Sequence, residues 1–126
     1  MTEFSVSLTN RPGQLAALTR LFADAGIEIE ALAAVADRGL SHVRIVVEQA
    51  PKARRLLMNA DIIFDENLVL DTFIPRGDGG LAAISESLAH AGVNVESMYL
   101  LHTNAEGFHV AMTVSDPDMA HQALAS

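Results

Sequence analysis

An internal repeat is the feature of this 126-residue sequence that most constrains its fold. Two apolar stretches recur at one constant offset: Leu15-Ala16-Ala17 as Leu81-Ala82-Ala83, and Ala25-Gly26 as Ala91-Gly92. His42-Val43 returns as His109-Val110 after one extra residue in the preceding turn. A repeat of this length indicates one structural module used twice. We therefore expect two modules, residues 1–67 and 68–126, with no Gly/Ser-rich or Pro-rich linker between them.

The hydrophobic pattern of the first module predicts the element order β-α-β-β-α-β. Apolar and polar residues alternate over residues 3–9, as in a strand with one buried face. A helical apolar stripe follows and ends at Gly26, where a left-handed C-terminal cap is expected. The remaining predicted elements are a hairpin over residues 27–48, a helix that begins near Pro51, and a strand at Ile62-Ile63-Phe64.

Two details of this first module are specific enough to be tested. The second strand is expected to begin at Ile27, with the apolar side chains of residues 27, 29, 31, 33 and 35 on one face. It should end at the turn Asp37-Arg38-Gly39. The run Asp65-Glu66-Asn67 is expected to be only a polar break between the modules.

The second module is expected to lack its last strand. Pro117 matches Pro51, so the repeat reaches Ser126 at the end of its second helix. One sheet edge would then be uncovered, which proteins seldom leave unpaired or unshielded. Met98-Tyr99-Leu100-Leu101 is apolar on both faces, and Phe73 lies on an otherwise polar face. We expect a homodimer whose sheets pair or pack across the interface; the alternative is a monomer that buries these groups against its own first module.

The best candidate for a ligand site is the stretch from Asn10 to Leu15, between the first strand and the first helix. Pro12 has no N–H and Gly13 has no β-carbon, so a ligand can approach the backbone closely. The N–H groups of Gly13, Gln14 and Leu15 are expected to point outward, unpaired, at the positive end of the helix dipole. Such a position favours a carboxylate or a phosphate. The alternative is an ordinary strand-to-helix turn.

The motifs Asn10-x-Pro12-Gly13-x-Leu15, Ala25-Gly26-Ile27-x-Ile29 and Ala91-Gly92-Val93-Asn94-Val95 resemble the ACT domain family, as a tandem pair over nearly the whole chain. The resemblance implies an α+β fold of two ferredoxin-like (βαββαβ) ACT modules, the second lacking its last strand. It also implies a non-catalytic regulatory protein that senses a small molecule, usually an amino acid, without a cofactor. Such domains are fused to metabolic enzymes or stand alone.

The resemblance implies a ligand at the first β–α loop near an inter-module or dimer interface, closed by the start of the second strand of a neighbouring module. The matching loop residues of the first module are Asn10, Pro12, Gly13, Gln14 and Leu15, and Arg11 between them is a further candidate. Those of the facing strand are Asn94, Val95 and Glu96. The second loop departs from the pattern: its candidates are Arg76, Gly79, Gly80 and Leu81, and Asp78 would repel a carboxylate.

An amino-acid ligand also needs acceptors for its ammonium group. Asn10, Glu30 and Glu96 are candidates, and the last two are equally compatible with solvated strand positions. A pocket near Ala31, Ala33 and Ala34 would prefer a modest apolar side chain. Arg11 is equally compatible with an exposed loop charge.

Composition excludes several other classes of protein. The formal net charge of −8 disfavours binding to nucleic acid or to an anionic membrane. There is no cysteine, and no apolar stretch approaches the length of a membrane span. A cytoplasmic protein is the default expectation. Lys52, Arg54 and Arg55 are interpreted as the solvated side of a helix.

Three alternatives to the sensor remain. The first is an interaction module that regulates a metabolic enzyme in trans without a ligand of its own. The second is an enzyme similar to acylphosphatases, with Arg11 and Asn94 as candidates, although the Gly-rich phosphate loop of that family is absent. The third is a metal site, for which His102 and His109 are expected to lie opposite each other; two histidines do not make a site, and we predict no metal.

Overall fold

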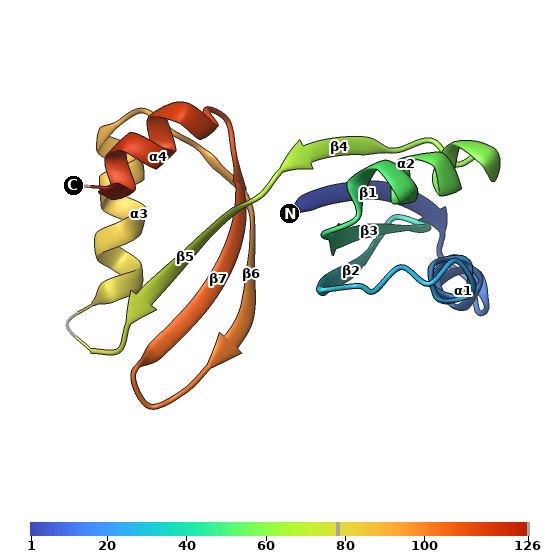
Figure 1. Cartoon of the computed structure of the whole chain (residues 1–126), viewed down its shortest axis with the longest axis horizontal. Coiled ribbons are helices and arrows are strands. Elements are labelled where there is room, and N and C mark those ends of the chain that lie inside the picture. Colours follow the sequence, from blue (N-terminus) through green and yellow to red (C-terminus); the bar gives the residue numbers. More distant parts are fainter. Residues whose placement is uncertain (78, 126) are drawn as a thin grey trace. The chain divides into compact units, whose positions relative to one another are not determined.

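The computed structural model describes residues 1–77 and 79–125. The chain divides into two compact units, Met1–Asn67 (unit 1) and Leu68–Ser126 (unit 2). Figure 1 shows helices and a sheet in each unit. None of the helices in the described part of the chain is long and apolar enough to cross a membrane.

Unit 1 is a four-stranded antiparallel sheet with two helices on one face. The elements are β1 (Thr2–Thr9), α1 (Gln14–Asp24), β2 (Ala31–Asp37), β3 (Leu40–Val47), α2 (Ala50–Asn59) and β4 (Asp65–Leu68). The last residue of β4, Leu68, is the first residue of unit 2. The strand order is β2-β3-β1-β4. Phe4, Leu18, Phe22, Ile45 and Leu57 are fully or almost fully buried in one core. The predicted first strand, both helices and the hairpin of unit 1 are confirmed.

The second strand differs from the prediction in its start and in its faces. It begins at Ala31, whereas residues 27–29 precede it as irregular backbone with Ile27 and Ile29 packed on the core. Leu32 lies opposite Ile45, so it is Leu32 that faces the helices, whereas Ala31 and Ala33 lie on the other face. The predicted period of two fails because residues 27–30 are not part of the sheet, so the apolar pattern spans irregular backbone and then a strand.

The fourth strand was predicted in the wrong place. Ile62-Ile63-Phe64 is irregular, with Ile62 and Phe64 packed on the core and Ile63 92% exposed. The expected polar break is the strand itself, β4, which pairs with β1. A strand at a sheet edge needs a neighbouring backbone rather than an apolar face, so its polar side chains are compatible with pairing.

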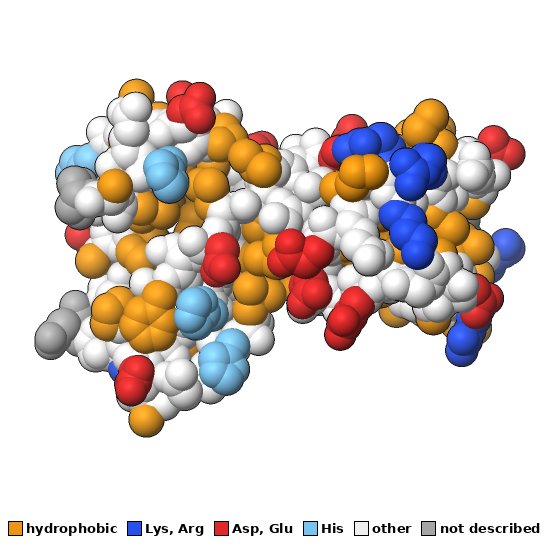
Figure 2. All heavy atoms as spheres, viewed as in Figure 1, with side chains coloured by type: hydrophobic (Ala, Val, Ile, Leu, Met, Phe, Trp, Pro, Cys, Tyr) orange, Lys and Arg blue, Asp and Glu red, His pale blue; other side chains and the backbone are white. Residues whose placement is uncertain are grey.

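Arg54 of α2 holds β4 from the side. Its Nε donates to Glu66 Oε1 over 2.8 Å, and its Nη2 donates to Oε2. The hydrogen bonds and the positive charge of Arg54 keep the pKa of Glu66 below its ordinary value. Figure 2 shows Lys and Arg side chains gathered over α2, where Lys52 and Arg55 are exposed as predicted.

Unit 2 repeats this architecture with three strands. Its elements are β5 (Leu70–Pro75), α3 (Gly80–His90), β6 (Val95–Thr103), β7 (Gly107–Val114) and α4 (Pro117–Ala125). The sheet order is β5-β7-β6, and α3 and α4 lie on one side of it (Figure 1). Ile74, Leu88, Val110 and Met112 form the core. The predicted fold class is therefore confirmed: two ferredoxin-like modules, the second without its last strand among the described residues.

Candidate functional site

The β1–α1 loop of unit 1 is an exposed turn held to the neighbouring hairpin. The N–H of Asn10 donates to Gly39 O over 2.9 Å, which fixes the loop beside the β2–β3 turn. Gly13 precedes α1 with a φ of 90°, a left-handed conformation in which a side chain would be strained. Residues 10–13 are all exposed, so this part of the backbone is open to a ligand.

Two of the three amides predicted to be unpaired are so in the structure. No acceptor within the described part of the chain binds the N–H of Gly13 or of Leu15. The Gln14 amide differs from the prediction, because it donates to Arg11 O in a long bond of 3.4 Å. This bond and the one from the Arg11 N–H to Thr9 O over 3.0 Å close the turn before α1.

The β5–α3 loop of unit 2 presents a similar end of a helix. Gly79 precedes α3 with a φ of 63°, and Gly80 N donates to Gly77 O over 3.2 Å. Among the described residues, the Leu81 N–H has no acceptor. A β-carbon on Gly80 would lie 2.6 Å from Pro75 O, so the loop can run here only with glycine. Asp78, which was expected to repel a carboxylate, lies outside the described residues.

Arg76 fastens this loop to the β6–β7 turn. Its Nε and Nη2 donate to Asn104 O over 3.0 and 2.7 Å, and Nη2 also donates to Thr103 Oγ1 over 2.8 Å. Its guanidinium carbon lies 4.8 Å from the centre of the Phe108 ring. No carboxylate of the described residues pairs with Arg76, so its positive charge is neutralised by none of them.

An open apolar cavity lies beside the same loop. Its volume is about 390 Å³, and its walls are Ile74, Leu81, Met98, Leu100, Phe108 and Val110. Ile74 and Leu81 flank the loop in sequence, and Phe108 carries the Arg76 guanidinium. The Leu81 N–H, which has no acceptor among the described residues, and the charged Arg76 side chain on Phe108 thus lie near an apolar hollow. Such a combination suits a small molecule with one anionic group and one apolar group.

Five of these six wall residues, all except Leu81, were missed as site residues by sequence reasoning. Met98 and Leu100 were recognised as part of a strand that is apolar on both faces, but they were assigned to the interface of the expected homodimer. Phe108 and Val110 were not recognised as site residues. The sequence does not show that α3 leaves a cavity over this part of β6 and β7. One sequence feature could have indicated the cavity. Leu100 is a large apolar residue on an edge strand, and the core of unit 2 is formed without it.

A second hollow, of about 510 Å³, lies in unit 1 and was not predicted. It is bounded by Ser5, Ser7 and Leu8 of β1 and by residues 61–65. It forms where the four-residue β4 leaves the later part of β1 without a neighbouring strand. Asp61 and Asp65 make it a poor place for a carboxylate ligand and a better one for a cationic group.

The strand-start candidates lie far from the loops of their own units. Ala31 pairs with Val46 and Thr2 with Val47, whereas Thr9 pairs with Leu40. Glu30 is therefore at the opposite end of the unit 1 sheet from the Asn10–Leu15 loop. In the same way, Asn94, Val95 and Glu96 lie at the far end of the unit 2 sheet from the Arg76–Leu81 loop. Within one unit, the structure does not bring the two sets together.

Local bonds hold the strand-start residues of unit 2 at this position. The Asn94 N–H donates to Ser115 Oγ over 2.9 Å, and Asn94 O accepts the Ser115 N–H over 2.9 Å. Glu96 lies at a register irregularity between Val95 and Ser97 and is exposed. Ala31 and Ala33 are half-buried in unit 1, and Ala34 is exposed.

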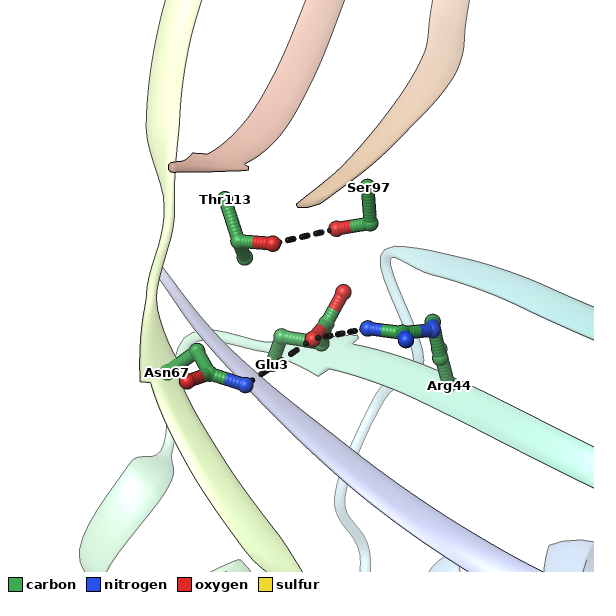
Figure 3. A network of polar contacts seen from close by, with 5 residues as sticks. All are labelled: Glu3, Arg44, Asn67, Ser97 and Thr113. Atoms are coloured by element: carbon green, nitrogen blue, oxygen red, sulfur yellow. Dashed lines mark hydrogen bonds and ion pairs between the residues drawn. The ribbon is translucent and has the colours of Figure 1, made fainter. Parts of the chain in front are cut away.

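Each unit also has a polar contact on the face without helices (Figure 3). In unit 1, Glu3 is fully buried and accepts hydrogen bonds from Arg44 Nη1 over 3.0 Å and from Asn67 Nδ2 over 3.3 Å. In unit 2, the hydroxyl groups of Ser97 and Thr113 lie 2.6 Å apart. The sequence pattern had placed Glu3 on a polar face with no sign that it is buried.

His102 lies opposite His109 in the β6–β7 pair, as predicted. His109 Nδ1 also lies 3.7 Å from Asp71 Oδ1, and its ring lies against Phe73. The described residues contain no group of three or more side chains suited to holding a metal ion.

Comparison with known proteins agrees with this architecture. The family model of the ACT domain matches residues 2–58. Protein BT0572 from Bacteroides thetaiotaomicron is 25% identical, with a TM-score of 0.85 over 98% of this chain and 85% of that one. None of the curated proteins compared with this chain matches it.

Two aspartate kinase structures share the fold at lower identity. The regulatory subunit of aspartate kinase from Thermus thermophilus is 18% identical, with a TM-score of 0.68 over 98% of this chain and 90% of that one. A structure of aspartokinase α and β subunits is 19% identical, with a TM-score of 0.67 over 98% and 88% of the two chains. These two likenesses concern the fold.

Proposed function

We propose that the protein is a non-catalytic regulatory protein that binds a small carboxylate of the amino-acid class at its first β–α loops and acts as a homodimer. The ACT match over residues 2–58 and the fold shared with aspartate kinase regulatory subunits support a regulatory role that depends on a small molecule. The identity of the ligand, the position of its site and the dimer are our own proposals.

The observation that carries the proposal is the apolar cavity of unit 2 with its polar edge. The Leu81 N–H and Arg76 Nη1, which bind no acceptor among the described residues, offer donors to a carboxylate, while Met98, Leu100 and Phe108 offer an apolar wall. A volume of about 390 Å³ is within the range of small-ligand sites. We infer that this site takes an amino acid with a large apolar side chain.

The unit 1 loop is the second proposed site. Asn10, Arg11, Pro12, Gly13, Gln14 and Leu15 form an exposed turn with free amides at Gly13 and Leu15. The ammonium group of the ligand would bind an acceptor from another chain of the dimer, with Glu30 or the segment Asn94-Val95-Glu96 as candidates. We assign the two ends of the ligand to different chains because the starts of β2 and β6 lie at the far end of their own sheets from the β–α loops.

A thermal-shift panel of the twenty amino acids and their 2-oxo acids tests the proposal. A ligand present at one hundred times its Kd stabilises the folded state by about 2.7 kcal/mol, so one class should raise Tm by several degrees. Leu100→Glu should abolish the response by placing a charge on the cavity wall. Leu32→Glu places the same charge on β2 of unit 1, at the position that matches Met98, and is the control.

The variant Arg76→Gln separates the two loops. If unit 2 holds the ligand, Arg76→Gln weakens binding and Arg11→Gln does not; the reverse result moves the site to unit 1. Absence of a Tm response to every compound, at concentrations up to the millimolar range, contradicts the sensor.

The alternative is an interaction module that regulates a metabolic enzyme without its own ligand. It is favoured by Ile63, which is 92% exposed at the edge of the unit 1 hollow. A metabolic enzyme that co-purifies with the native protein and is lost with Ile63→Asp, together with no Tm response, would establish it.

A further inference from the structure

The outer edge of β5 carries main-chain groups that no described strand of unit 2 covers. β5 pairs with β7 on one side only, because the sheet order is β5-β7-β6. In unit 1, the corresponding strand β1 lies between β3 and β4. There, Phe64 precedes β4 and packs edge-on against Phe4, with ring centres 5.4 Å apart. The same module therefore has a covered first strand in one copy and an open one in the other.

The bonding register shows which groups face outward. Hydrogen-bonded residues alternate along an antiparallel pair. The Arg76 N–H donates to Glu106 O at the end of the β5–β7 pair, so residues 70, 72 and 74 face β7. On the other side of β7, the Ser115 N–H donates to Asn94 O, which agrees with this alternation. The N–H and C=O groups of Asp71 and Phe73 consequently point away from the sheet.

A shallow groove accompanies this edge on the helix side. It has a volume of about 190 Å³ and is bounded by Leu70, Asp71 and Thr72 of β5 and by His121, Leu124 and Ala125 of α4. Leu70 and Leu124 are only partly buried against the unit 2 core. An additional strand beside β5 would bury both and fill the groove.

We propose that β5 of a second copy of this chain pairs with β5 in antiparallel orientation across a two-fold axis, making one continuous sheet from the two unit 2 sheets. The sequence of β5 fits its own copy. With Thr72 opposite Thr72 of the partner subunit, Leu70 faces Ile74 on the helix side, and Asp71 faces Phe73 on the other. Asp71 and Phe73 then exchange four main-chain hydrogen bonds between the two chains.

The neighbouring registers are worse by the same criteria. Centring the pair on Asp71 sets two carboxylates directly opposite each other. Centring it on Phe73 sets Asp71 opposite Pro75, which has no N–H to donate. A shift by one residue sets outward-pointing main-chain groups opposite groups that point toward β7, so the ladder of hydrogen bonds cannot form. The register centred on Thr72 is therefore the one we assign.

This proposal deepens the proposed dimer and does not depend on the ligand. The first test compares Asp71→Pro with Asp71→Ala by equilibrium sedimentation. Proline removes the outward N–H and is tolerated on an edge strand, whereas alanine keeps the N–H and removes the same side chain. Two hydrogen bonds are lost per dimer, so Asp71→Pro should raise the dimer Kd about 30-fold relative to Asp71→Ala, with unchanged circular dichroism.

The second test is a disulfide between the two chains, which is clean because the chain has no cysteine. Residues of a non-hydrogen-bonded antiparallel pair have Cα atoms about 4.5 Å apart, within disulfide range. Thr72→Cys should cross-link as a dimer on mild oxidation, and Ala89→Cys on the exposed side of α3 should not. A monomeric native chain overturns this interface together with the proposed dimer. A dimer that neither responds to Asp71→Pro nor cross-links through Thr72→Cys overturns this interface alone.

Discussion

The guanidinium of Arg76 lies over the ring of Phe108, with Cζ 4.8 Å from the ring centre, while its nitrogens donate to Thr103 and Asn104. One side chain thus joins the β5–α3 loop, the β6–β7 turn and the wall of the unit 2 cavity. Because these contacts join parts of the protein itself, Arg76 contributes to folding as well as to the proposed binding.

Replacing Arg76 should therefore lower stability. Arg76→Gln removes the hydrogen bonds to Asn104 O and the contact with the ring, and we expect the free energy of unfolding to fall by about 1–2 kcal/mol. Urea denaturation measures it. Arg55→Gln, on the exposed side of α2, should change it by less than about 0.5 kcal/mol. Equal effects of the two variants would show that Arg76 is a solvated side chain.

Gly80 should be the least replaceable residue of its loop. Gly80→Ala places a β-carbon 2.6 Å from Pro75 O and 2.8 Å from Ile74 Cγ2, so the backbone must move. We expect a loss of about 3 kcal/mol or more. Gly79→Ala, which meets only Ala82 Cβ at 3.9 Å but has a positive φ, should lose about 1–2 kcal/mol. The opposite order in thermal unfolding would contradict the crowding at Gly80.

Arg44 should stabilise unit 1 through the buried Glu3. Arg44→Met removes a charge-assisted hydrogen bond of 3.0 Å to a carboxylate that is fully buried, and we expect a loss of about 2 kcal/mol. Arg38→Met is the matched control, because the Arg38 side chain is 94% exposed in the neighbouring turn. Urea denaturation of both variants decides: similar midpoints would mean that Arg44 adds nothing.

The contribution of Glu66 should depend on pH. Arg54 lowers the pKa of Glu66 in the folded state, so the ionised carboxylate stabilises the fold above the unfolded pKa of about 4.3. This contribution is lost as the pH falls through the lower, folded-state pKa. We expect native protein and Glu66→Gln to differ in Tm at pH 7 and to converge toward pH 3. A difference that does not change with pH would assign the effect to the shape of the side chain.

The fold could be predicted from the sequence because its main signals are local or repeated. The alternation around Phe4 and the stripe of α1 follow from elementary periodicities, and the second module follows from the repeat. The position of β4 was not predicted because its pairing depends on the backbone of β1, which lies far away in the sequence. The strand was predicted at Ile62-Ile63-Phe64 because these residues are apolar. Ile62 and Phe64 pack on the core, but their backbone is irregular.

Less of the candidate site could be predicted. The free amides of Gly13 and Leu15 follow from the end of any helix, and the structure agrees with both. The cavity does not follow from a motif, because its walls come from three strands and a helix. Its polar edge depends on Arg76, whose sequence context gave no indication of the β6–β7 turn that it binds.

The crowding around Gly80 also affects how relatives of this chain should be interpreted. A position that no side chain can occupy will remain glycine whether or not a ligand is recognised nearby. Invariance at Gly80 would thus report steric selection, and variation at Arg76 or Leu100 would be the better record of a changing ligand.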